Sequence, residues 1–233
     1  MFIAHSGVKT HVSNLLSRKF PKKPTWLSRL FGLTGLIVAL VILAGITGFL
    51  LWSRSPANLS TAGTATKADL LQSWQAGEVV ALVRHAERCD RSTNPCLGPA
   101  DGITKAGSVE AAAVGQGFLR LGLSQTDVLS SPVTRTVQTA HYMLGKDAMT
   151  QEWLSICGKT LRNDVVAHKV AHRNLVLVTH SGCIHGFEAQ TGFKHAKKSE
   201  YGSSLFVRIS ADGELQVLGI VSANGWHSLL SEK

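Results

Sequence analysis

Acidic residues are absent from the first 54 positions of this 233-residue chain, although the same stretch holds seven lysines and arginines. Residues 55–233 hold 17 basic and 15 acidic side chains, so the formal net charge of +9 belongs mainly to the N-terminal end. A nucleic-acid-binding domain carries its positive charge on the folded domain itself. The charge distribution therefore argues against a nucleic-acid partner.

Cysteine, proline and charged residues are also scarce. Four cysteines are too few for a small disulfide scaffold, and six prolines with 22 glycines exclude a collagenous or low-complexity chain. A hydrophobic fraction of 44% with 17% charged residues excludes a disordered protein. The length suits one ordinary domain with an additional segment.

Several catalytic motifs are missing as well. No cysteine is followed six positions later by arginine, and the chain has neither Asp-x-Asp nor a glycine-rich phosphate loop. A serine-hydrolase elbow at Ser181 would need glycine at position 179, which is Thr179. His168 and His172 have helical spacing but lack the glutamate of the zinc motif HExxH. We therefore expect no metal and no cofactor.

One uncharged run of 24 residues lies between Arg29 and Arg54. As a helix it would reach about 36 Å, whereas the hydrocarbon core of a bilayer is roughly 30 Å thick. Trp26 and Trp52 flank the run, and tryptophan favours the membrane interface. This pattern predicts a transmembrane signal-anchor helix over 30–52.

The basic flank 1–29 predicts the orientation of that helix, because positive flanks stay in the cytoplasm. We expect a single-pass inner-membrane protein with a cytoplasmic N-terminal tail and a periplasmic C-terminal domain. The alternative is a periplasmic protein released by signal cleavage. Signal peptides have shorter apolar regions, of about 7–15 residues, and this N-terminal region is long for one.

The remainder of the chain has the pattern of a layered α/β domain. Residues 53–65 have the small, polar composition of a linker, so the domain is expected over 66–233. Apolar runs alternate with helical periodicity, which favours a three-layer α/β/α sandwich around a mostly parallel, mixed sheet. Strands are predicted at 78–84, 126–130 and 174–179, helices at 104–121, 132–144 and 160–172, and an antiparallel hairpin at 204–210 and 214–221.

The informative side chains come where predicted strands end. Arg84 and His85 end the first strand, Arg135 follows the second, and His180 follows the third. Ligands of open α/β sheets bind outside the carboxyl ends of the strands, so these groups are expected to meet in one pocket. Guanidinium groups bind phosphate oxygens, and a neutral imidazole is a competent nucleophile. The pattern therefore indicates phosphate chemistry.

The segment Arg84-His85-Ala86 resembles the Arg-His-Gly signature of the histidine phosphatase superfamily, with alanine in place of glycine. The resemblance covers about residues 78–186. It implies that His85 is a nucleophile forming a phosphohistidine and that His180 is the second histidine of the pocket. It further implies phosphate binding by three arginines, Arg84, Arg88 and Arg135. For Arg88 a surface ion pair with Glu87 or Asp90 is the alternative.

A closer resemblance is to the lipopolysaccharide core heptose(II)-phosphate phosphatases, which are periplasmic members of the superfamily. It lies in the stretch 84–97, RHAERCDRSTNPCL, together with Cys157-Gly158 and the N-terminal anchor. Many members carry a proton-donating carboxylate after the second histidine, where this chain has Ser181, or in a glutamate segment between the motifs. Candidates for a general acid are Glu87, Glu152 and Asp164.

The four cysteines allow three disulfide connectivities. An exported domain meets an oxidising compartment, which favours two disulfides over four thiols. Cys89 and Cys96 enclose a short polar loop after the histidine motif, and Cys157 and Cys183 would then pair across the domain. Buried free thiols are the alternative.

These features predict a membrane-anchored phosphomonoesterase that needs no metal. Its expected substrate is a phosphorylated small molecule or glycolipid, and the closer resemblance implies a heptose phosphate of the lipopolysaccharide core. The alternatives are a catalytically weak or inactive phosphate-binding module of the same fold, and a phosphatase for another periplasmic sugar phosphate.

Overall fold

A computed structural model of the chain describes residues 26–51, 55–210 and 212–231, with the backbone alone at 26–33, 50 and 51. The chain divides into two units, 1–52 and 53–233, and each is described by itself.

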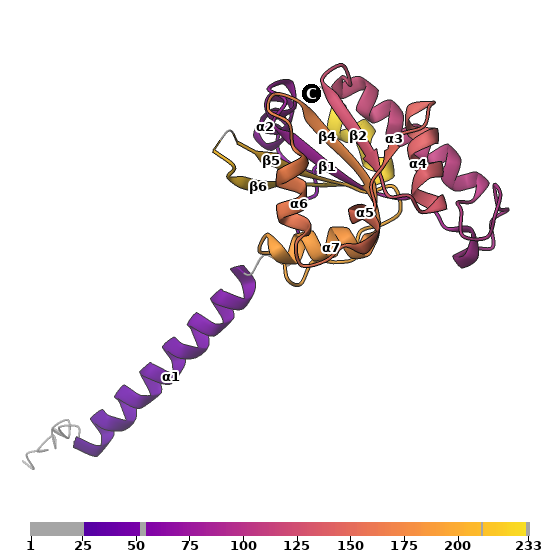
Figure 1. Cartoon of the computed structure of the whole chain (residues 1–233). Helices are drawn as coiled ribbons and strands as arrows, with labels where there is room; N and C mark the ends of the chain where they lie inside the picture. Colours follow the sequence, from indigo (N-terminus) through magenta and orange to yellow (C-terminus); the bar gives the residue numbers. More distant parts are fainter. Residues whose placement is uncertain (1–25, 52–54, 211, 232–233) are drawn as a thin grey trace, which may run out of the picture. The chain divides into compact units, whose positions relative to one another are not determined.

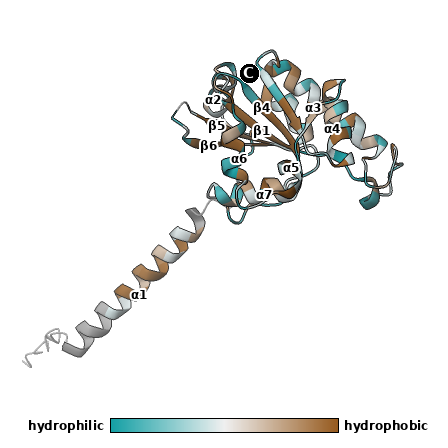
Figure 2. Ribbon diagram, in the orientation of Figure 1, coloured by the Kyte–Doolittle hydropathy of each residue, from teal (hydrophilic) through white to brown (hydrophobic). Residues whose placement is uncertain are grey.

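The N-terminal unit contains one helix, α1 (Trp26–Leu51), of 26 residues. Its side chains over 34–49 are exposed, and Figure 2 shows hydrophobic residues along this stretch. Among the described residues, no helix combines the length and the apolarity that a membrane crossing requires. Most of the predicted tail 1–29, and the side chains at both ends of the predicted span 30–52, lie outside the described residues.

The C-terminal unit is built on a six-stranded sheet in the order β3-β2-β4-β1-β5-β6 (Figure 1). The first four strands in this order run parallel, and β5 and β6 are antiparallel additions beside β1. The mixed sheet is the predicted one, and only the two-residue β3 was not expected. The strands are β1 (Val79–Arg84), β2 (Thr126–Ser130), β3 (Met149–Thr150), β4 (Asn174–Thr179), β5 (Ser204–Ile209) and β6 (Leu215–Val221).

Helices cover both faces of this sheet, which makes the predicted three layers. Every residue of β1 and β4 is buried, as expected for central strands packed on both sides. One face packs around Phe118 and Phe206, and the other around Leu177 and Phe187. The first face carries α2 (Thr64–Gln75), α3 (Lys105–Leu121), α4 (Thr134–Leu144) and α8 (Trp226–Leu230), and the second α5 (Trp153–Ile156), α6 (Leu161–His168) and α7 (Ser181–Gln190).

Two predicted boundaries are corrected. The linker expected over 53–65 is shorter, because residues 57–59 pair along β6 and Leu59 is fully buried. This pairing satisfies backbone groups at an otherwise open sheet edge. The helix expected over 160–172 ends at His168, where Lys169 leaves the helical conformation.

The strand pairing decides where the motif residues meet. Arg84 at the end of β1 pairs with Thr179 at the end of β4, and Ser130 at the end of β2 pairs with Val178. The carboxyl ends of three neighbouring parallel strands therefore share one edge of the sheet. Because β5 runs antiparallel to β1, its first residue, Ser204, also lies at that edge.

Candidate active site

His85 is the most enclosed imidazole at this edge, with 3% of its surface exposed. Its Nδ1 lies 2.8 Å from the backbone carbonyl oxygen of Ala86. A carbonyl only accepts, so Nδ1 carries the proton and Nε2 keeps its lone pair. The pKa of His85 is lowered to about 3, mainly by burial and less by the charges of Arg135 and Arg84, and the hydrogen bond to Ala86 only partly opposes this. The imidazole is therefore neutral at pH 7.

His180 stands beside it, with the two ring centroids 5.5 Å apart. Arg135 donates from Nη2 to His180 Nδ1 over 3.2 Å, so the proton of the neutral ring is on Nε2. That nitrogen lies 3.0 Å from Ser131 Oγ and donates to it. The pKa of His180 is lowered to about 4, mainly by burial and less by the charges of Arg135 and Arg88.

The contact with Ser131 corrects a prediction about the helix that follows β2. The helix predicted over 132–144 would begin directly after Ser131, and a Ser-Pro pair is typical of a capped helix start. Instead α4 begins at Thr134 with Val133 as its N-cap residue, and the Ser131 hydroxyl faces His180. The hydroxyl thus fixes an imidazole rather than a helix end.

Arg84 and Arg135 supply positive charge to the site, and neither makes an ion pair with a carboxylate of the described residues. Arg84 is 8% exposed, donates to the Ser199 carbonyl and has its guanidinium carbon 3.8 Å from the centre of the Tyr201 ring. In both arginines the Nε atom is buried without a hydrogen-bond partner in the described structure. Buried donors of this kind are normally satisfied, so the pair is suited to an anion with several acceptor oxygens.

Arg88 shows the alternative pairing considered for it. Its guanidinium makes a two-point ion pair with Asp90, with Nε 2.7 Å from Oδ1. Even so, its charge lowers the pKa of both His180 and Arg135. Burial is the larger cause in both cases, and for His180 the charge of Arg135 also has a larger effect than that of Arg88. Arg88 therefore contributes to the positive potential of the site while its side chain is held by Asp90.

This arrangement brings together a neutral imidazole with a free lone pair, a second imidazole and three guanidinium groups. A neutral imidazole can attack phosphorus, and guanidinium groups can bind phosphate oxygens and stabilise charge during phosphoryl transfer. Among the described residues no group of three metal-ligating side chains is close enough to hold a metal ion.

The three carboxylates considered as general acids are not placed alike. Glu87 accepts hydrogen bonds from Asn94, Thr104 and Ser92, which together hold its pKa below the usual range. A carboxylate fixed in its charged form by three donors is a poor proton donor. Glu152, at the start of α5, and Asp164, on α6, make no side-chain hydrogen bond or ion pair in the described structure.

Sequence reasoning did not find Tyr201. Its ring lies over the guanidinium of Arg84 and 5.7 Å from the ring of His85, so it forms one wall of the site. The next residue, Gly202, has φ +64, and a side chain there would meet Glu110. Tyr201 comes shortly before the strand predicted at 204–210, which was the only sequence signal for its position. The sequence did not show that this strand pairs with β1, which brings Tyr201 to the site.

Both disulfides predicted as a pair of bridges are present, Cys89–Cys96 and Cys157–Cys183, and no cysteine is free in the described part of the chain. The first closes the loop that follows His85. The second joins the residue after α5 to Cys183, three positions beyond His180. Each bridge therefore fixes a segment that borders the site.

Solved structures share this fold. A phosphoserine phosphatase from Entamoeba histolytica, in complex with 3-phosphoglyceric acid, matches with a TM-score of 0.50 at 15% identity and covers 64% of this chain and 98% of its own. The SixA protein from Agrobacterium tumefaciens, assigned as a phosphohistidine phosphatase, matches with a TM-score of 0.50 at 18% identity, covering 63% and 97%. At these identities the likeness concerns the fold.

Sequence comparison is more specific. No family model matches the chain. A lipopolysaccharide core heptose(II)-phosphate phosphatase from Escherichia coli O139:H28 is 34% identical over 152 residues, covering 64% of this chain and 73% of that protein. Fold, site and relatives together define the class, a phosphoric monoester hydrolase of the histidine phosphatase type. Within this class, the chain belongs to the family of the lipopolysaccharide core heptose(II)-phosphate phosphatases.

Proposed function

We propose that this protein is a membrane-anchored phosphatase that hydrolyses a phosphate monoester through a phosphohistidine on His85. The observation that carries the proposal is the state of His85, which is buried and neutral, with a free Nε2 facing a site that holds Arg84 and Arg135. Nε2 attacks phosphorus, the bond to the leaving oxygen breaks, and that oxygen takes up a proton. Water then attacks the phosphohistidine, releasing inorganic phosphate and the free imidazole.

The substrate we propose is a heptose phosphate of the lipopolysaccharide core. Support comes from the curated E. coli relatives, which carry this activity in their name and share 34% identity with the chain. Phosphate release from isolated lipopolysaccharide core, compared with release from simple sugar phosphates, tests this assignment. Faster release from the sugar phosphates would favour a phosphatase for another periplasmic sugar phosphate.

We further propose that residues 30–52 anchor the protein in the inner membrane with the phosphatase domain in the periplasm. Support comes from the uncharged sequence of this segment, its basic flank, and the exposed apolar side chains of α1, such as Leu40 and Val41. Two disulfides in the domain fit an oxidising compartment.

The nucleophile is tested with the full chain purified in detergent, with p-nitrophenyl phosphate as substrate and EDTA present. We expect turnover by the wild type and none by His85→Ala, while His185→Ala, an exposed histidine on α7, retains turnover. Rapid quenching with labelled substrate should trap an acid-labile phosphoenzyme that requires His85. Near-wild-type turnover by His85→Ala would overturn the mechanism, and no turnover by the wild type would favour an inactive phosphate-binding module.

A further inference from the structure

The loop that follows the histidine motif is unusually well fixed for a segment at the mouth of a site. The Cys89–Cys96 disulfide closes it, and Glu87 accepts hydrogen bonds from Ser92 and Asn94 within it. Backbone bridges join Arg88 to Ile103 and Cys96 to Thr104 at the two ends of the loop. The backbone of this loop is therefore held in place.

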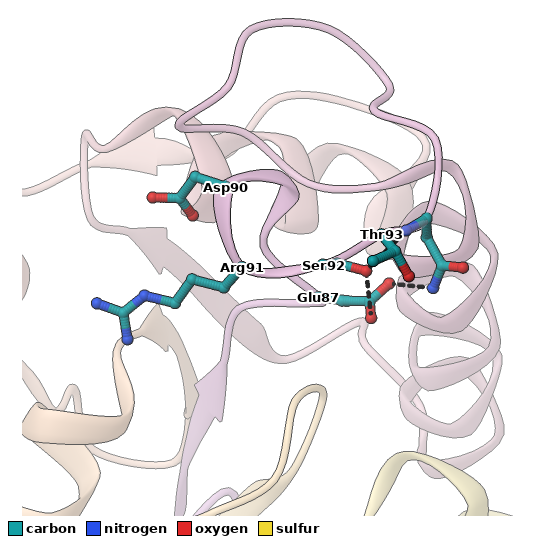
Figure 3. A pocket seen from close by; sticks show the side chains of 6 residues that line it. Glu87, Asp90, Arg91, Ser92 and Thr93 are labelled. Carbon is teal, nitrogen blue, oxygen red and sulfur yellow. Dashed lines mark hydrogen bonds between the residues drawn. The ribbon is translucent and has the colours of Figure 1, made fainter.

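The loop carries two charged side chains, Asp90 and Arg91, both in the short turn η1 (Cys89–Arg91). Figure 3 shows them extending on one side of the loop, while Glu87 and Ser92 lie on the other side. Asp90 is occupied by its two-point ion pair with Arg88. Arg91 is exposed and its guanidinium makes no hydrogen bond or ion pair with any described residue.

The position of Arg91 places its charge beside the phosphate-binding arginines. It lies in the same turn as Asp90, which pairs with Arg88, and the charge of Arg88 acts on His180. Burial is the largest cause that lowers the pKa of Arg84 and of Arg135, and the charge of Arg91 lowers both pKa values further. An unpaired cation close to other cations is unfavourable unless an anion binds near it.

We propose that Arg91 binds a second anionic group of the substrate, outside the pocket formed by Arg84, His85, Arg135 and His180. The inference rests on the proposed phosphatase function and names its substrate class: a phosphate ester that carries a further phosphate or carboxylate. The disulfide and the backbone bridges fix the backbone that carries Arg91, so only its side chain has to be ordered when the substrate binds, which lowers the entropic cost of binding. Arg91 thus determines specificity, whereas the transferred phosphoryl group is bound by the other arginines.

The test compares glucose 1,6-bisphosphate with glucose 6-phosphate, using phosphate release by the full chain in detergent. We expect the wild type to prefer the bisphosphate, and Arg91→Ala to lower kcat/KM for it by about three- to tenfold, mainly through KM. The loss for glucose 6-phosphate should be about twofold at most, because only the general positive potential is reduced. Arg91→Lys should restore part of the preference, since it keeps the charge but not the two-point geometry.

The matched control is Arg162→Ala. It removes a different exposed arginine, on α6, and should leave kcat/KM for both substrates unchanged. An equal loss for both substrates, or an unchanged preference in Arg91→Ala, would overturn the role of Arg91. Wild-type protein that is inactive on p-nitrophenyl phosphate and on isolated lipopolysaccharide core would contradict the proposed function, whereas inactivity on the two sugar phosphates alone would not. In that case calorimetric binding of glucose 1,6-bisphosphate to the wild type and to Arg91→Ala decides between retaining and rejecting the second anion site.

Discussion

The proposed reactivity of His85 depends on its pKa of about 3, to which burial contributes most and the positive charges around it contribute less. An exposed histidine has a pKa near 6.5 and would be largely protonated, and so not nucleophilic, at pH 5. Here the hydrogen bond from Nδ1 to the Ala86 carbonyl also fixes which nitrogen keeps the lone pair. The residue type came from the motif, but its protonation state comes from its surroundings.

A pH profile tests this state. Because the pKa values of His85 and His180 are lowered to about 3 and about 4, we expect kcat/KM to show no loss from imidazole protonation between pH 7 and pH 5. Arg135→Met should lower kcat by about 10²–10³ and move the acid limb to higher pH, because the lost charge no longer opposes protonation. Comparing the two profiles on one substrate cancels the titration of the substrate itself. An acid limb near pH 6.5 in the wild type would contradict the assignment.

At the scale of elements, each disulfide fixes a different segment, so their removal should have different effects. Replacing Cys89 and Cys96 by serine should cost about 2–3 kcal/mol of stability and raise KM, because the loop that carries Asp90 and Arg91 and is joined to Arg88 loosens. Replacing Cys157 and Cys183 should cost more, about 3–4 kcal/mol in the chain-entropy model, because it opens a longer loop. Denaturant unfolding and steady-state kinetics of the two double variants check this. A rise in KM seen only in the variant that lacks Cys157 and Cys183 would contradict this prediction.

Helix α7 carries a second pH-dependent feature, Glu188. Its side chain is 1% exposed, its Oε2 has no hydrogen-bond partner in the described structure, and burial raises its pKa to about 7. The folded pKa lies above the unfolded value of about 4.3, so the contribution to stability is full below about pH 4 and is lost as pH rises through 7.

We therefore expect Glu188→Gln to be more stable than the wild type at pH 8, by about 1–3 kcal/mol, and to show little difference at pH 4. For a domain of this size each kcal/mol corresponds to a Tm shift of about 2–4 °C. Thermal unfolding at the two pH values measures it, with the exposed Glu214→Gln as control. Equal Tm differences at both pH values would show that Glu188 does not titrate as described.

At the scale of the whole molecule, the proposed topology makes its own prediction. A reporter active only in the periplasm should work when fused after Lys233, and the protein should stay in the membrane fraction after a carbonate wash. Exchanging the six basic residues of 1–29 for neutral ones should weaken the orientation, because these charges hold that flank in the cytoplasm. An active cytoplasmic reporter at the same position would reject this topology. Release of a shortened chain into the periplasm would favour signal cleavage instead.

The sequence by itself determined the strands and the phosphate-binding motif. The run Leu175–Val178 is apolar at every position because both faces of a central strand are covered, so such strands are readable without a structure. His85 and His180 follow such strands directly, and parallel strands end at a common edge, so their meeting was also predictable. Thr104, the first residue of the helix predicted over 104–121, caps that helix by accepting a hydrogen bond from the backbone N–H of Gly107.

Only the tertiary structure decided which neighbours these residues acquire. Tyr201 reaches Arg84 because β5 pairs with β1, and strand order depends on contacts between residues far apart in the chain. Ser131 faces His180 rather than a helix end, and Glu87 is held by three donors, through side-chain contacts that depend on packing. The pKa of His85 likewise follows from burial, which results from how the whole domain packs around it.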